Sequence, residues 1–260
     1  MTIITLTTDF GMRDPYVAAM KGVLRRHCPK ATIDDLTHDI APQDILEAAL
    51  FIEAAIPWYP KGTVHLIVVD PGVGTARRPV AVSAGGHVFV GPDNGLLTLW
   101  LMRHKMDWAY QIRPDANNGV MISNTFHGRD IFAPAAAWLA DGGAPEALGD
   151  AVTSLDKLPL PTTRRDGKGR QAGVIIHIDH FGNCITNIQR EGDTDGTIAG
   201  TVHVGDHIFP LHTTYGDVAP GAPLALYGSG NRLEIAVNQG NAARQFGLAR
   251  MMSALLAGAS

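Results

Sequence analysis

Short apolar runs alternate with helical patterns through the first half of the chain. The stretches 2–10, 31–36 and 63–70 are rich in β-branched and apolar residues and end in polar or turn residues, which is typical of strands. Two more strands are expected at 79–84 and 87–92. The run 63–70 is almost continuously apolar, as in a parallel strand covered on both faces. The pattern predicts an α/β fold whose mostly parallel sheet has flanking helices.

Three helices are expected between or after these strands. Asp14 is predicted to cap the first helix with Pro15 in its first turn, followed by apolar residues at helical spacing. Asp44 is predicted to cap the second helix, which begins at Ile45. The apolar stretch 130–140 predicts the third helix.

The pattern changes near residue 155. Residues 156–170 hold prolines, glycines and five lysines or arginines without apolar periodicity, which is typical of a linker. Short strand-like segments follow, so we expect an α/β domain over 1–155 and a smaller β-rich, barrel-like domain over 171–260. The stretch 241–256 is expected to form a last helix.

Composition narrows the class of protein. Of 260 residues, 45% are hydrophobic and 18% charged, which is typical of a folded chain, and the net charge of −4 argues against nucleic acid as the main partner. Two cysteines are too few for a disulfide framework, and no apolar run is long enough to span a membrane. Residues 1–10 lack the basic start of a signal peptide, so we expect a cytoplasmic protein that acts on a small molecule.

Three carboxylates follow predicted strands. Asp9, Asp70 and Asp93 each lie just after an apolar run, where the carboxyl ends of parallel strands form a ligand crevice. Aspartate is also a common turn residue, so any one of them has a structural reading as well. Asp70 is distinctive because Gly72 and Gly74 remove side chains beside it, which allows a ligand or backbone to approach closely.

The stretch 123–130 is the second unusual segment. His127 precedes the helix expected at 130–140, where backbone N–H groups favour a neutral ring and bound anions or polarised water. Asp130 has a simpler reading as a helix cap. The sequence lacks the common zinc, dinucleotide and ATP motifs, so we expect no metal and no cofactor.

Six ordered motifs together indicate a family. They are TTDFG, DPYVAAMKG, VVDPGVG, NTFHGRD, IDHFGNCITNI and LEIAVNQGNAA, spread over residues 3 to about 245. In this order the chain resembles the S-adenosyl-L-methionine hydroxide adenosyltransferases, relatives of the fluorinases and chlorinases. The resemblance implies hydrolysis of S-adenosyl-L-methionine to adenosine and L-methionine by activated water at ribose C5′. It also implies an N-terminal α/β domain, a C-terminal β-barrel, and homotrimers with sites between subunits.

The resemblance also implies site residues. Asp70, Arg77 and His127 would activate the water, with Arg78 as the alternative to Arg77. Asp9 would bind the ribose hydroxyls. The methionine and adenine groups would be bound by residues of the later motifs: Asp179 on the ammonium, Ser229 on the carboxylate, Phe181 and Asn183 on the adenine, and Tyr215 as a weaker stacking candidate. Asp14 and Phe126 complete the implied substrate-binding set.

Three other functions are weighed against hydrolysis. A halogenase is disfavoured because Asp70 and Gly230 depart from the halogenase pattern, and because an unscreened carboxylate 4 Å away would repel a halide by roughly 4 kcal/mol. A metal-dependent nucleotidase would use Asp9, Asp70, Asp93 and Asp130 as oxygen ligands. A nucleoside sensor would bind without turnover.

Overall fold

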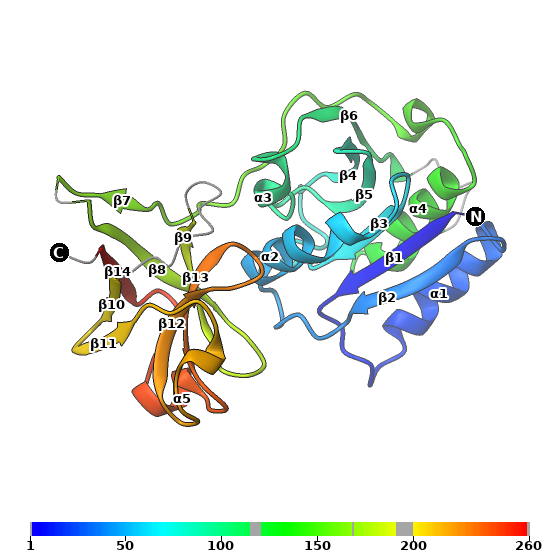
Figure 1. Cartoon of the computed structure of the whole chain (residues 1–260). Helices are drawn as coiled ribbons and strands as arrows, with labels where there is room; N and C mark the ends of the chain where they lie inside the picture. The colour runs from blue at the N-terminus through cyan, green and yellow to red at the C-terminus, as the bar shows by residue number, and fades with distance from the viewer. Residues whose placement is uncertain (1, 115–120, 168, 191–199, 259–260) are drawn as a thin grey trace. The chain divides into compact units, whose positions relative to one another are not determined.

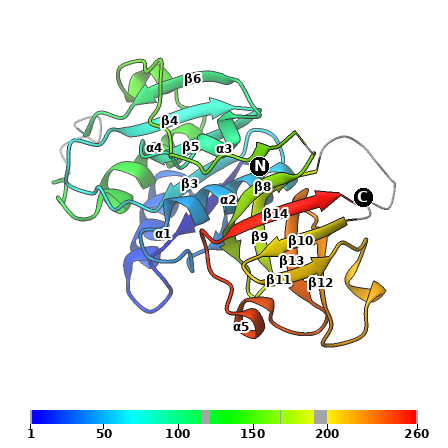
Figure 2. The same cartoon turned by 90° about the vertical axis from the view of Figure 1, so that its left-hand side faces the viewer.

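The computed structural model describes residues 2–114, 121–167, 169–190 and 200–258. The chain divides into two compact units, residues 1–158 and 159–260, which are described separately (Figures 1 and 2). Among the described residues, no helix combines the length and the apolar character that crossing a membrane requires.

The N-terminal unit is built on one six-stranded sheet with strand order β2-β1-β3-β5-β4-β6. Strands β2, β1, β3 and β5 are parallel, whereas β4 is antiparallel to both β5 and β6. The strands are β1 (Ile3–Thr8), β2 (Thr32–Thr37), β3 (Val64–Val68), β4 (Pro79–Ala84), β5 (His87–Pro92) and β6 (Met106–Gln111). The expected parallel-containing α/β fold is confirmed, and β6 is a strand that the sequence reading did not include.

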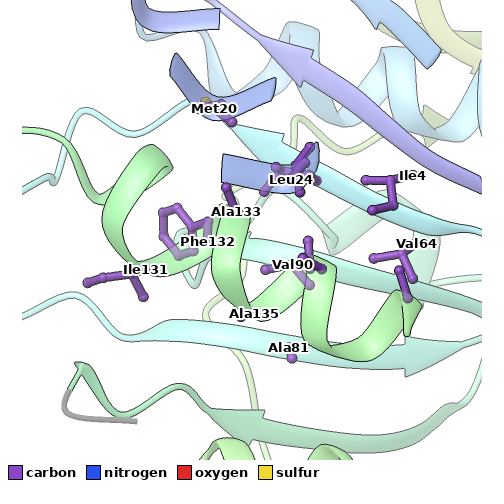
Figure 3. Close-up of a cluster of buried hydrophobic side chains, with 14 of the residues drawn as sticks. Ile4, Met20, Leu24, Val64, Ala81, Val90, Ile131, Phe132, Ala133 and Ala135 are labelled. Atoms are coloured by element: carbon purple, nitrogen blue, oxygen red, sulfur yellow. The ribbon is translucent and has the colours of Figure 1, made fainter. Parts of the chain in front are cut away.

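Helices cover both faces of this sheet. One face packs on α1 (Tyr16–His27) and α4 (Ala133–Ala140), and the cluster between them is drawn in Figure 3. The other face packs on α2 (Ile45–Ala55) and α3 (Thr98–Leu101). Strand β3 contributes Leu66 and Val68 to the first cluster and Ile67 to the second. Alternate side chains of a strand point to opposite faces, so the continuous apolar run follows from burial on both sides.

The helix starts differ in part from the sequence expectations. Asp44 caps α2 as predicted, because its Oδ1 accepts the Glu47 N–H at 2.9 Å. The prediction for Asp14 is wrong: Pro15 is the residue before the helix, α1 begins at Tyr16, and no side chain caps it. Asp130 does not cap the third helix either. It lies inside a π-helical turn (Gly128–Phe132) that precedes α4, and its carboxylate accepts the Ser123 N–H.

The C-terminal unit is a nearly closed antiparallel barrel, with strand order β11-β10-β14-β8-β9-β13-β12. A bridge between Leu211 and Ala225 brings the two ends of this order together, and β7 (Arg164–Arg165) pairs with β8 outside it. The expected barrel is therefore confirmed. Its strands are β8 (Gln171–Ile178), β9 (Cys184–Gln189), β10 (Gly200–Val204), β11 (His207–Pro210), β12 (Pro223–Tyr227), β13 (Arg232–Val237) and β14 (Ser253–Gly258).

The end of the chain corrects another expectation. The predicted helix over 241–256 is only the short α5 (Ala242–Phe246), followed by strand β14. Gly247 adopts a left-handed conformation with φ 62°, which ends the helix as a glycine commonly does. Strand β14 then pairs with both β10 and β8. The barrel needs this strand between them, so tertiary pairing prevails over the local helical pattern.

Candidate active site

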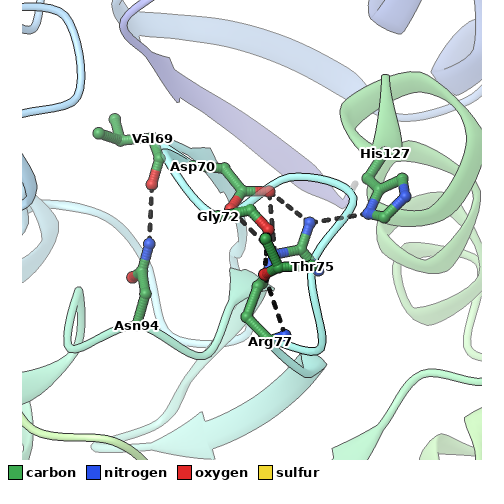
Figure 4. Close-up of polar contacts among 7 residues, drawn as sticks. All are labelled: Val69, Asp70, Gly72, Thr75, Arg77, Asn94 and His127. Atoms are coloured by element: carbon green, nitrogen blue, oxygen red, sulfur yellow. Dashed lines mark hydrogen bonds and ion pairs between the residues drawn. The ribbon is translucent and has the colours of Figure 1, made fainter. Parts of the chain in front are cut away.

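Asp70 lies two residues beyond the carboxyl end of β3, in the loop drawn in Figure 4. The loop is folded on itself: the Thr75 hydroxyl donates to the Gly72 carbonyl at 2.7 Å, and the Arg77 N–H donates to the Thr75 hydroxyl at 3.4 Å. Asn94 donates to the carbonyl of Val69 at 3.0 Å, which holds the start of the loop. These bonds return the chain so that Arg77 faces Asp70.

The loop also depends on a glycine. Gly74 has φ +76°, and a Cβ built there would lie 2.7 Å from the backbone oxygen of Asn124. Both the conformation and the contact exclude a side chain. Asn124 belongs to the segment that leads to His127, so the close approach of Gly74 keeps the two segments together.

Arg77 and Asp70 form a buried ion pair. The Arg77 Nε lies 2.9 and 3.0 Å from the two Asp70 oxygens, and Nη2 also donates to Oδ2. The two side chains are only 9% and 6% exposed, and the guanidinium lies 5.0 Å from the Phe132 ring centroid. A forked contact of this kind compensates both charges. The expectation of an unscreened carboxylate at Asp70 is therefore wrong. The repulsion between this carboxylate and a halide is weaker than expected for an unscreened charge.

His127 completes the cluster that we call the trio: Asp70, Arg77 and His127. Its Nδ1 lies 2.8 Å from Nη2 of Arg77 (Figure 4). Burial and the neighbouring Arg77 charge lower the pKa of His127, although Asp70 and Asp130 oppose this. An arginine nitrogen can only donate, so Nδ1 accepts and a neutral ring carries its proton on Nε2. His127 thus presents an N–H donor on its far side.

Arg78 is directed elsewhere. It donates to the Asp93 carboxylate through Nε at 2.9 Å, and Asp93 also accepts the Asp156 N–H at 2.8 Å. Burial raises the pKa of Asp93, and the Arg78 contact opposes that shift. Asp93 therefore anchors the chain near residue 156. The structure brings Arg77, rather than Arg78, to Asp70 and His127.

The four-carboxylate metal site is not formed. Asp70, Asp93 and Asp130 are each paired with an arginine. Among the residues that the structure describes, no three histidine, cysteine or acidic side chains form a group arranged to hold a metal ion. In place of the arrangement expected of a metal-dependent nucleotidase, three of the four carboxylates form separate ion pairs, and the Asp9 carboxylate accepts the Gln43 N–H.

Asp9 follows the strand next to the one that precedes Asp70. The register pairs Thr8 of β1 with Val68 of β3, so both aspartates lie at the same edge of the sheet. The Asp9 Oδ2 accepts the Gln43 N–H at 2.8 Å, which fixes the carboxylate. Asp14 is exposed in the loop before α1.

Phe126, beside His127, belongs to an aromatic cluster. Its ring centroid lies 6.1 Å from that of Phe10 and 5.3 Å from that of Tyr16. The sequence reading named neither Phe10 nor Tyr16. Phe10 is part of the TTDFG motif and Tyr16 is part of the DPYVAAMKG motif. Their positions inside family motifs could have indicated them as candidate site residues.

In the C-terminal unit, Asp179 shapes the turn between β8 and β9. Its carboxylate accepts the N–H groups of Phe181 and Asn183 at 3.0 and 2.8 Å, and the Asn183 side-chain amide at 3.0 Å. Asn183 is buried, whereas the Phe181 side chain at the tip of the turn is 70% exposed. Three of the predicted residues therefore lie in one hydrogen-bonded turn.

Tyr215 and Ser229 are the other predicted residues of this unit. Ser229 is exposed in the turn between β12 and β13. The Tyr215 hydroxyl donates to Oε1 of Glu234, a contact that the sequence reading missed. Glu234 lies in β13, where every residue is buried.

Comparison with known proteins identifies the family. The model of the SAM hydroxide adenosyltransferase N-terminal domain matches residues 4–149, and that of the C-terminal domain matches residues 173–253. The chain belongs to the SAM hydroxide adenosyltransferase family. The trio lies within the matched N-terminal domain, and Asp179, Tyr215 and Glu234 lie within the matched C-terminal domain.

Relatives of the chain match along almost its whole length. A Thermus thermophilus protein named (R)-S-adenosyl-L-methionine hydrolase is 42% identical, over 95% of this chain and 96% of its own. A Salinispora tropica protein of the same name is 40% identical, over 94% of each chain. The crystal structure of an uncharacterized conserved protein from Thermotoga maritima has a TM-score of 0.89 at 32% identity, covering 98% of this chain and 99% of that one. A protein named fluorinase from Actinopolyspora mzabensis is more distant, at 29% identity.

Proposed function

We propose that the chain hydrolyses S-adenosyl-L-methionine to adenosine and L-methionine, with a water oxygen attacking ribose C5′. The contact among Asp70, Arg77 and His127 is the observation that carries the proposal. It places a carboxylate, a guanidinium and a neutral imidazole around one point at the carboxyl end of a parallel sheet, where α/β proteins bind ligands. The names of two similar relatives support the same reaction.

The reaction requires little help for the leaving group. The C5′–S bond breaks with its electron pair passing to sulfur, so the positive sulfonium becomes the neutral thioether of methionine. The C5′–O bond forms from water, which loses one proton. Because the leaving group needs no protonation, the site has to orient and activate the water.

Each member of the trio has a role in that activation. Arg77 lowers the energy of a developing hydroxide by its charge. His127 donates from Nε2 to the water oxygen, because its Nδ1 already accepts from Arg77. The neutral ring has no free acceptor nitrogen in this tautomer, so Asp70 takes the proton. Base assistance of this type is worth about 10²–10⁴ in rate.

Substrate recognition is assigned to the remaining candidates. One Asp9 oxygen is held by Gln43, which leaves the carboxylate oriented to accept from the two ribose hydroxyls. The aromatic cluster with Phe126 includes Phe10, the residue after Asp9, and this cluster and the exposed Asp14 are assigned to substrate binding as well. In the C-terminal unit, Asp179 pairs with the methionine ammonium, Ser229 with its carboxylate, and Phe181, Asn183 and Tyr215 with the adenine.

Product analysis tests the function. Purified protein is incubated with S-adenosyl-L-methionine, and the expected products are equal amounts of adenosine and methionine, with and without a chelator. Because the relatives are named for the (R) epimer, the two sulfur epimers are assayed separately and the (R) epimer is expected to react faster. A 5′-halo-5′-deoxyadenosine as the main product with fluoride or chloride would instead identify a halogenase. Loss of activity on chelation would indicate a metal enzyme, and binding without products a sensor.

The remaining expectations extend the proposal. We expect S-adenosyl-L-methionine as substrate without a further cofactor, a homotrimer, a cytoplasmic location and no nucleic-acid partner. The homotrimer, with sites between subunits, follows from the family resemblance. The reaction itself consumes only water and the sulfonium substrate, which is the chemical reason to expect no added cofactor.

A further inference from the structure

A tyrosine hydroxyl is anchored on a buried carboxylate in the C-terminal unit. Tyr215 begins a short 3₁₀ turn, Tyr215–Asp217, whose start is fixed by reciprocal hydrogen bonds between Thr214 and Asp217. Its hydroxyl donates to Oε1 of Glu234 on β13. Tyr215 remains 38% exposed, whereas Glu234 is 7% exposed. The hydroxyl end of the ring is therefore fixed inside the protein while part of the side chain faces outward.

Glu234 has few alternatives to this contact. Across the described ranges, no other hydrogen bond and no ion pair involves its carboxylate. Burial raises the pKa of Glu234, the Asp179 charge adds to the increase, and the Tyr215 hydroxyl opposes it. A buried carboxylate left without its donor is costly, so the bond from Tyr215 is strongly favoured. Glu234 therefore restricts where the Tyr215 ring lies.

The backbone is shaped to allow this arrangement. A Cβ built on Gly228 would lie 2.3 Å from Oε2 of Glu234, so the glycine leaves the space that the carboxylate occupies. Ser229, proposed for the substrate carboxylate, is the next residue. Burial and Glu234 raise the pKa of Tyr215, and the charge of Asp179, proposed for the ammonium, adds to the increase for both Tyr215 and Glu234. Tyr215 and Glu234 thus lie among the residues assigned to the substrate.

We propose that Glu234 is a positioning residue, which holds the Tyr215 ring in the orientation that stacks on the adenine of the substrate. This inference rests on the proposed function for the identity of the nucleoside. An aromatic ring stacked on a base adds to affinity, and a ring fixed beforehand loses less entropy on binding. Glu234 acts through Tyr215 and touches no reacting atom.

The test is a double-mutant cycle on KM and on adenosine affinity. Tyr215→Phe removes the donor and keeps the ring, whereas Glu234→Leu removes the acceptor. Each is expected to raise KM and the adenosine Kd about 3- to 10-fold with kcat within about twofold, and the double variant is expected to match the single ones. Glu234→Gln keeps an acceptor oxygen and should restore most of the affinity. Tyr227→Phe, at another tyrosine of this unit, is the matched control.

Independent effects would overturn the inference. If the effects of Tyr215→Phe and Glu234→Leu on Kd multiply in the double variant, or if neither changes Kd, Glu234 does not act through Tyr215. Circular dichroism verifies folding. If Glu234→Leu fails to fold, Tyr215→Phe and Glu234→Gln decide: Tyr215→Phe must raise the adenosine Kd at least 3-fold while Glu234→Gln stays within about twofold of wild type, and an unchanged Kd in Tyr215→Phe overturns the inference. Failure of the wild type to release adenosine and methionine would refute the proposed function, whereas the adenosine titration still tests the inference.

Discussion

At the scale of single residues, Arg77 is the centre of the trio. Its planar guanidinium reaches both oxygens of Asp70 and the Nδ1 of His127 at the same time. A lysine ammonium has three donors at one point and cannot reproduce this fork. The geometry of Arg77, in addition to its charge, therefore fixes the tautomer of His127.

Substitution by lysine should distinguish the role of Arg77 from that of Arg78. Arg77→Lys is expected to lower kcat by about 10²-fold or more, because the charge stays but the bridge is lost. Arg78→Lys, the matched control, changes an ion pair with Asp93 and should leave kcat within about threefold. Steady-state kinetics of the two variants measures the difference, and equal losses would remove Arg77 from its assigned role.

The protonation of His127 predicts a pH profile. Because burial and Arg77 lower its pKa below 6.5, the neutral form that accepts from Arg77 persists as the pH falls through 6.5. The rate constant kcat should show no decrease caused by His127 at pH 6.5, and the decrease should come at lower pH. The His127 ring resonances, assigned by comparison with His127→Gln, give the titration directly. A midpoint at or above 6.5 would contradict the assignment.

The sequence predicted the members of the trio, but it did not predict the contacts of Asp93 and Glu234. The family motifs contain Asp70 and His127, and the seven-residue spacing favoured Arg77 over Arg78. Asp93 resembled a ligand-facing carboxylate in the sequence, yet it is 4% exposed and holds the backbone at Asp156. The contact between Glu234 and Tyr215 could not be predicted from the sequence, because it depends on how β13 and the turn that contains Tyr215 pack in the folded unit.

At the scale of elements, the loop between β3 and β4 positions the trio. Its Gly74 combines a positive φ with close contact to Asn124, while Gly62 has φ +84° and no heavy atom within 4 Å of a built Cβ. An alanine at either position would have the backbone strain of a positive φ. Only at Gly74 would its Cβ also contact another part of the chain. Comparing them isolates what the contact contributes.

Alanine at these two glycines should give different outcomes. Both variants are expected to lose about 1–2 kcal/mol of unfolding free energy, because an L-residue is strained at positive φ. Gly74→Ala should lose more stability, and should also lower kcat at least tenfold, because the loop has to move away from Asn124. Chemical denaturation and steady-state rates test this, and equal effects on kcat would show that the contact does not position the site.

Buried histidines in the sheet predict the response to acid. His65 on β3 is fully buried between Thr5 of β1, 2.7 Å from its Nδ1, and His87 of β5, 3.1 Å from its Nε2. Burial and the His87 charge lower the pKa of His65 to about 3, from an ordinary 6.5. The folded state therefore binds fewer protons than the unfolded state between these values, so stability falls as the pH drops below 6.5.

The expected loss from His65 is about 2 kcal/mol at pH 5, since each pH unit below 6.5 costs about 1.4 kcal/mol. His65→Gln removes this titration, so its unfolding free energy should depend less steeply on pH between 6.5 and 5. His27→Gln, on the exposed end of α1, should retain the wild-type slope. Denaturation at several pH values measures the slopes, and a His65→Gln slope equal to wild type would refute the account.

The elements that the sequence predicted are those whose local pattern and tertiary contacts agree. Strand β3 and the cap of α2 are examples. The last predicted helix failed because β14 is needed between β10 and β8, a requirement that no local window contains. The π-helical turn before α4 was not predicted either. Its Gly128 lies close to Met20, which is distant in sequence, and no local window contains such a contact.

At the scale of the whole molecule, the order of the motifs carried more information than any single pattern. Six motifs distributed over both units indicated the family, and family models match both parts of the chain. Apolar periodicity by itself predicts an α/β unit followed by a β-rich unit. It does not specify the reaction, because the same fold class hosts many chemistries and the site residues decide among them.

The source of the oxygen in the product tests the central claim most directly. Purified protein is incubated with S-adenosyl-L-methionine in water enriched in ¹⁸O, and the adenosine is analysed by mass spectrometry with fragmentation. The account predicts one ¹⁸O atom at the 5′ position, unlabelled methionine, and loss of this product in Asp70→Asn. Adenosine without label at C5′, or undiminished formation by Asp70→Asn, would contradict water attack assisted by the trio.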